Sequence, residues 1–111
     1  MTAATGTTDL AARTRIAVRR AADYIADRIA TARDGSDGDW RNPDVRAAFL
    51  RALDGITVYS PGPGRVVATI ADTHHGRLWH YVAHDALRAA CPADGEVRQV
   101  AATMYHLIIR P

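Results

Sequence analysis

The chain has 111 residues, one cysteine and a formal net charge of +2, with 48% hydrophobic and 23% charged residues. This length and balance fit one folded domain and exclude a chain that is disordered throughout. A single cysteine excludes an internal disulfide, and no apolar run approaches the length needed to cross a bilayer.

The composition is strongly biased: all 14 basic residues are arginine, and alanine is the most frequent residue. We interpret this bias as the mark of a GC-rich genome and expect an actinobacterial or phage origin. The first residues have no apolar segment of the kind found in secretory signals, and a lone cysteine is compatible with a reducing compartment. We therefore expect a cytoplasmic protein that does not bind membranes.

The N-terminal segment, residues 1–8, is small and polar, which predicts a disordered tail ahead of a single α+β domain over residues 9–111. A long amphipathic helix is then predicted over residues 9–33, which contain neither glycine nor proline. Its apolar residues recur at steps of three and four, so they share one face. They are Ala11, Val18, Ala22, Ile25, Ile29 and Ala32.

This apolar stripe is narrow and rich in alanine, as in contacts between two helices. It predicts that the first helix binds a second copy or a partner protein. The residues expected at that contact are Ala11, Val18, Ala22, Ile25 and Ile29. Packing of the stripe within the chain is the alternative.

A second helix is predicted from the signals at its two ends. Asn42 is a good N-cap, Pro43 fits the first helical position, and Gly55 is placed to end the helix. The acidic connector before it, residues 34–39, superficially resembles a calcium-binding loop. It lacks the glutamate at the twelfth position, so we expect a simple turn.

The period of the sequence then changes from helix to strand. Residues 56–60 and 65–71 are rich in β-branched residues and flank the turn 61–64, which predicts an antiparallel β-hairpin. Residues 77–83 fit either a third strand, which completes a three-stranded meander, or the start of a helix that runs to Cys91. We favour the strand, followed by a short helix.

The C-terminal segment, residues 96–109, carries apolar residues at helical spacing and is expected to form a helix; a strand at its β-rich end is the alternative. The fold class is therefore α+β. It consists of a long N-terminal amphipathic helix, a second helix, a hairpin or three-stranded meander, and C-terminal helices.

Five histidines in the C-terminal half are the candidates for chemistry: His74, His75, His80, His84 and His106. On a helix, His80 and His84 share one face at a spacing that suits zinc, but the glutamate of the usual zinc-protease motif is absent. Acid–base catalysis needs two imidazoles across a cleft, so His106 has to lie close to one of them. Cys91 is expected to be buried and unreactive, since reactive cysteines prefer helix N-termini or cationic neighbours.

Arginines on the first helix and on the hairpin offer a different function, a small nucleic-acid-binding regulator. They are Arg13, Arg15, Arg19, Arg20, Arg65 and Arg77. Aspartates interrupt the cluster along the helix, and the net charge is small for a nucleic-acid-binding domain.

The sequence contains no recognisable catalytic motif, metal-ligand set or cofactor loop, and we expect no cofactor. We expect a non-enzymatic interaction or regulatory module that acts through protein–protein contacts and forms a homo-oligomer through the first helix. A nucleic-acid-binding regulator and a histidine-dependent enzyme or metal protein are the alternatives.

Overall fold

The computed structural model describes residues 2–34, 41–71 and 78–111. Within them, the chain forms α1 (Thr2–Asp34), α2 (Pro43–Asp54), β1 (Ile56–Gly62), β2 (Arg65–Ile70), α3 (Leu78–Ala90), β3 (Glu96–Ala101) and β4 (Met104–Ile108). The predicted connector and calcium-like loop lie almost wholly outside the described residues, as do His74, His75 and Arg77.

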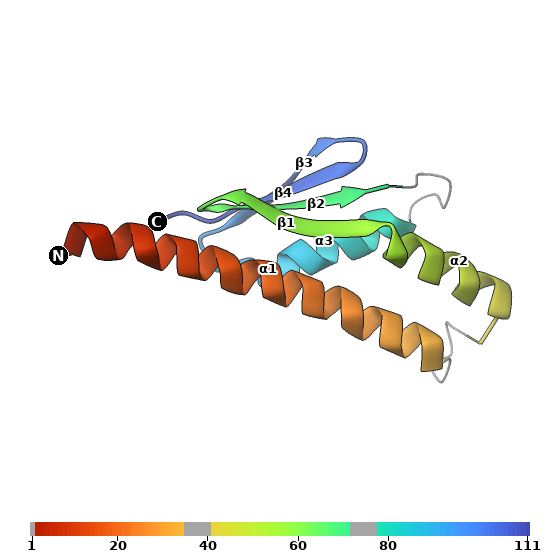
Figure 1. Ribbon diagram of the computed structural model, residues 1–111. Coiled ribbons are helices and arrows are strands. Elements are labelled where there is room, and N and C mark those ends of the chain that lie inside the picture. The colour runs from red at the N-terminus through yellow and green to blue at the C-terminus, as the bar shows by residue number, and fades with distance from the viewer. Residues whose placement is uncertain (1, 35–40, 72–77) are drawn as a thin grey trace.

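The four described strands form one antiparallel sheet in the order β1-β2-β4-β3. Figure 1 shows α1 and α3 on the same face of this sheet, while α2 leads into the start of β1. The other face carries none of the described helices. Helices gathered on one face of an antiparallel sheet define the α+β class, so the predicted fold class is confirmed.

The core lies between this sheet and its helices. Alternate residues of a strand point to the same face, and Val66, Ala68 and Ile70 of β2 are buried together with Tyr105 and Leu107 of β4. The helices contribute Ala17, Ala21, Ile25, Ala32, Phe49, Ala52, Leu53, Val82, Ala83, Ala86, Leu87 and Ala90. Many of these residues are alanines, so the helices approach the sheet closely.

A buried hydroxyl links α1 to the turn of the β1–β2 hairpin. Thr14 is only 2% exposed, and its Oγ1 donates to the Leu10 carbonyl at 2.6 Å. The same oxygen accepts from the Gly64 backbone N–H at 2.8 Å. Gly64 has a φ of 85°, and a Cβ there would lie 2.9 Å from the Ile109 carbonyl oxygen. The turn of the hairpin is thus held against the helix.

The predictions for the first two helices and the hairpin are largely confirmed. Asn42 caps α2 by accepting from the backbone N–H groups of Asp44 and Val45, and Pro43 occupies the first turn. Strands β1 and β2 pair as predicted, although β1 continues through Gly62 and shortens the expected turn. The structure continues α1 back to Thr2; the disordered tail over residues 1–8 stays a prediction.

Two predictions for the C-terminal half are wrong. Of the favoured strand over residues 77–83, the described residues 78–83 instead begin α3, so the described strands form no three-stranded meander. The buried residues of α3, which are Val82, Ala83, Ala86, Leu87 and Ala90, keep helical spacing over about two turns, which outweighs the β propensity of the first few residues.

The predicted helix over residues 96–109 is the β3–β4 hairpin, so α3 is the one C-terminal helix among the described residues. Tyr105, Leu107 and Ile109 are buried, whereas the residues between them are partly exposed. This alternation is the two-residue period of a half-buried strand. The helical spacing in the sequence was coincidental.

Candidate interaction surface on the first helix

Helix α1 lies against the sheet along one line of residues, which leaves two long sides partly open. The buried line consists of Thr14, Ala17, Ala21, Ile25 and Ala32. One side of the helix faces β1 and α2, and the other faces α3 and the C-terminal end of β4. The two sides differ in chemistry and are described in turn.

Four of the five residues predicted to bind a partner lie on the side next to β1 and α2. Ala22 is exposed, while Ala11, Val18 and Ile29 are half-buried. We call these four residues the α1 flank. The fifth, Ile25, is 7% exposed and belongs to the core of the same chain. The structure therefore places the predicted stripe at the border between core and surface.

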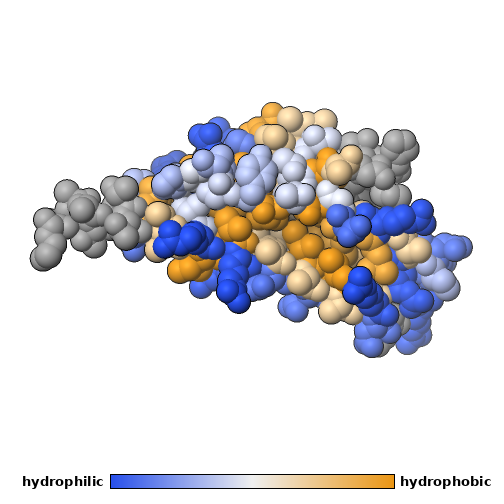
Figure 2. Space-filling model, viewed as in Figure 1, coloured by the Kyte–Doolittle hydropathy of each residue, from blue (hydrophilic) through white to orange (hydrophobic). Residues whose placement is uncertain are grey.

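Neighbouring elements extend the apolar character of the α1 flank. Leu50 of α2 and Ile56 and Val58 of β1 are half-buried and pack against the edge of the core. Figure 2 shows the result as a band of hydrophobic residues across the middle of this face of the molecule. A contiguous apolar band on a small monomer is typical of a protein–protein contact.

Shallow hollows lie at both ends of the α1 flank. One, of about 260 Å³, is lined by Ile29, Arg33, Leu50, Arg51 and Asp54. The other, of about 270 Å³, is lined by Ala11, Thr14, Arg15, Ser60, Gly62 and Pro63. Each hollow combines apolar walls with at least one arginine, and the volume of each has room for part of a partner's side chain.

Strand β1 lies at one edge of the described sheet, beside the α1 flank. About half of its backbone N–H and C=O groups therefore have no partner strand within that sheet. The Ala71 N–H donates to the Gly55 carbonyl at 2.9 Å. Hydrogen-bonded pairs alternate along antiparallel strands, so Thr57 and Tyr59 bond to β2. The N–H and C=O groups of Ile56 and Val58 consequently point away from β2.

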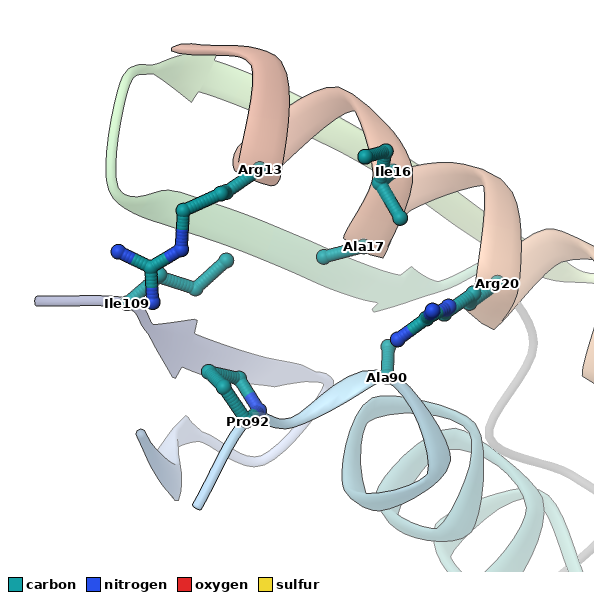
Figure 3. Close-up of a pocket in the computed structure, with 7 residues that line it drawn as sticks. All are labelled: Arg13, Ile16, Ala17, Arg20, Ala90, Pro92 and Ile109. Atoms are coloured by element: carbon teal, nitrogen blue, oxygen red, sulfur yellow. The ribbon is translucent and has the colours of Figure 1, made fainter. Parts of the chain in front are cut away.

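The opposite side of α1 borders a small pocket of about 210 Å³ (Figure 3). Its lining residues are Arg13, Ile16, Ala17, Arg20, Ala90, Pro92 and Ile109. Arg13 is held there by a 2.9 Å hydrogen bond from Nη1 to the Arg110 carbonyl, and its Nη2 lies 3.8 Å from the Asp94 carboxylate. Ile16 is 51% exposed at the rim.

The arginines predicted to bind nucleic acid are divided among separate surfaces. Arg13 and Arg20 line the pocket beside α3, whereas Arg15 lines a hollow on the β1 side of the helix. Arg65 lies at the hairpin turn, next to Leu10 and Pro111. The structure thus does not gather these described arginines into one basic patch. Nucleic-acid binding stays an untested alternative.

The three described histidines do not all converge on one site. His80 and His84 lie on α3 and face Tyr105 of β4: a 2.7 Å hydrogen bond joins His80 Nδ1 to the Tyr105 hydroxyl, and both rings meet the tyrosine edge to face. His106 follows Tyr105 in the strand, so it lies on the opposite face of the sheet. Among the described residues, no group of three or more candidate ligands could hold a metal ion.

Burial shifts the proton equilibria of several groups in this half of the chain. It raises the pKa of the Tyr105 hydroxyl, which favours the neutral phenol as hydrogen-bond partner of His80. The pKa of His106 is lowered, mainly by burial and also by the positive charge of Arg65. Tyr105 was missed by sequence reasoning, because its alternation with Leu107 was not recognised as a strand.

Cys91 lies just after α3 and is half-buried. Burial is the main cause that raises the pKa of its thiol, and the Asp94 carboxylate raises it further against the opposing effect of Arg88. The thiol of Cys91 donates to the Pro92 carbonyl oxygen at 3.3 Å. In the described part of the chain, no cationic group lies at hydrogen-bond distance from its Sγ atom. This environment disfavours the thiolate that nucleophilic chemistry requires.

Comparison with protein-family models, curated proteins and solved structures finds no match to this chain. Among the described helices, none combines the length and the apolar character needed to cross a membrane. The geometry of the chain itself is therefore the basis for a functional proposal.

Proposed function

We propose that this chain is a non-enzymatic interaction module that self-associates through its first helix. The α1 flank carries the proposal: its exposed and half-buried apolar residues continue onto α2 and β1 as one band. Completing the burial of a half-exposed aliphatic side chain contributes about 1 kcal/mol. Burial of several such residues on each copy favours association, and it opposes the entropic cost of bringing two chains together.

The edge of the sheet supports the same proposal. The outward-pointing backbone groups of Ile56 and Val58 lie next to the α1 flank, and an unpaired strand edge is a ready site for pairing with another chain. A partner that covers the α1 flank also comes close to these groups. Both kinds of contact are then available on one side of the molecule.

The test is the mass of the wild-type protein in solution, measured by size-exclusion chromatography with light scattering across a range of concentrations. We expect a mass above that of one 12.0 kDa chain, which falls on dilution. Ala22→Arg places a large charged side chain at an exposed position of the α1 flank, and we expect it to yield the monomer.

The matched control is Ala89→Arg, at an exposed position of α3 outside the α1 flank. It adds the same side chain to a helix of the same protein and should leave the mass unchanged. A wild-type protein that stays monomeric at all concentrations refutes the proposal. An Ala22→Arg variant that associates as well as the wild type shows that another surface is responsible.

A further inference from the structure

Four charged residues form a ridge along the exposed side of α1, which begins beside the α1 flank at Arg15 and winds away from it towards Asp27. Arg15, Arg19, Asp23 and Asp27 follow one another at steps of four residues, and all four are exposed. Steps of four place successive residues on neighbouring turns of one side of a helix. Within the described part of the chain, no ion pair involves any of these four residues. The ridge therefore presents its charges outward.

The order of charges along this ridge is complementary to itself when reversed. Read from the N-terminal end, it is positive, positive, negative, negative. In an antiparallel pair of helices whose exposed sides cross at the level of residue 21, Arg15 faces Asp27 of the other copy, and Arg19 faces Asp23. A parallel pair places like charges opposite each other. Self-complementarity of one patch is the requirement of a two-fold symmetric interface.

The residues at the predicted crossing point allow two helices to approach closely. Ala22 and Ala26 are exposed beside the ridge, and neither extends beyond a methyl group. Helices with small residues at the contact reach the short end of the usual interaxial distance, about 8 Å. The charged ridge then borders an apolar contact, as charged positions border the seam of a coiled coil.

We infer that the partner of the α1 flank is a second copy of this chain, packed with its α1 antiparallel to the first across a two-fold axis on the exposed side of the helix, at the level of residue 21. This inference rests on the proposed self-association and specifies its geometry. The charge order of the ridge favours a second copy over an unrelated partner, because the same four residues supply both halves of every predicted ion pair.

Charge reversal tests the inference. Arg19→Asp and Asp23→Arg each turn two attractions into repulsions, one on either side of the axis, so each variant alone should dissociate about ten- to thirtyfold more readily than the wild type. An equimolar mixture of the two variants restores both attractions and should form a heterodimer of near wild-type affinity. Sedimentation equilibrium at low salt measures all of these affinities.

Arg88→Asp is the matched control for these variants. It makes the same charge change at an exposed position of α3, outside the ridge, and should leave self-association unchanged. Circular dichroism of each variant confirms that the helices are intact, since all three positions are exposed.

The outcomes separate this inference from the proposed function. If the wild type self-associates but Arg19→Asp and Asp23→Arg do not weaken it, or their mixture does not restore it, the antiparallel geometry is wrong and self-association stands. If the wild type is monomeric and stays so in every mixture, both fail. Weakening by each variant alone with recovery in the mixture supports the two-fold arrangement.

Discussion

The hydroxyl of Thr14 should be a major contributor to stability. Among the described residues, it makes the one hydrogen bond between a buried side chain of α1 and the backbone of the hairpin turn. It donates to the Leu10 carbonyl and accepts from the Gly64 N–H, and the side chain is 2% exposed. Thr14→Val preserves the shape of the side chain and removes the oxygen. The Gly64 N–H then loses its partner in a partly buried position.

Leaving a buried backbone donor unsatisfied costs about 1–3 kcal/mol of folding free energy. For a domain of this size, each kcal/mol lowers the melting temperature by roughly 4 °C. We therefore expect Thr14→Val to melt about 4–12 °C below the wild type. Thermal and urea denaturation followed by circular dichroism measure the change.

Thr31 provides a matched control on the same helix. Its hydroxyl donates to the Asp27 carbonyl at 3.0 Å, as that of Thr14 does to Leu10, but it is exposed and accepts no bond from the hairpin. Thr31→Val should change the stability by less than about 0.5 kcal/mol. If Thr14→Val is no more destabilising than Thr31→Val, the link to Gly64 does not stabilise the fold.

Two further predictions concern ionisable groups. Because the pKa of His106 is lowered in the folded chain, the unfolded chain binds a proton more readily, so stability should be lost as the pH falls below the ordinary value of 6.5. Arg65→Gln removes one cause of the shift, and NMR titration of the imidazole should give a higher pKa; an unchanged or lower value contradicts the assignment. The raised pKa of Cys91 leaves little thiolate at pH 8, so the folded protein should react with a thiol reagent more slowly than the urea-unfolded chain. Equal rates in the two states refute this account of Cys91.

The elements that could be predicted from the sequence are those with local signals at their ends. The α2 helix is bounded by Asn42 and Pro43 at its start and by Gly55 at its end, and the geometry of the N-cap follows from the residue types Asn42 and Pro43. The β1–β2 hairpin has a change of period and a proline–glycine turn. In each case the signal needs no knowledge of the rest of the fold.

The C-terminal half was mispredicted because its signals are not local. Residues 77–83 contain the β-forming aromatic residues Trp79 and Tyr81, but the described buried positions of α3 start at Val82 and continue at helical spacing to Ala90. Residues 104–109 alternate, yet Val97, Val100 and Ala101 add a helical spacing that spans two separate strands. Tertiary packing decides between such patterns, and a single sequence does not contain it.

The first helix shows a similar limit for the candidate site. The predicted stripe and the buried line share Ile25 and Ala32, but the buried line also runs through Ala17 and Ala21. Alanine occurs on nearly every side of α1, so hydrophobicity alone does not identify the side that faces the sheet. The charge order of the ridge is readable from the sequence, whereas the exposure of all four residues requires the structure.

Distances between two copies of α1 test the central claim most directly. A nitroxide label is attached to a cysteine at position 22 or position 33, both exposed, in a Cys91→Ser background. Antiparallel packing about an axis at the level of residue 21 brings the two labels at position 22 close together. It separates those at position 33 by about 36 Å along the helix axis, given a rise of 1.5 Å per residue. Continuous-wave electron paramagnetic resonance should detect the short distance at position 22, and pulsed measurements should detect the long distance at position 33. Short distances at both positions indicate parallel helices, and the absence of any distance between copies contradicts self-association through α1.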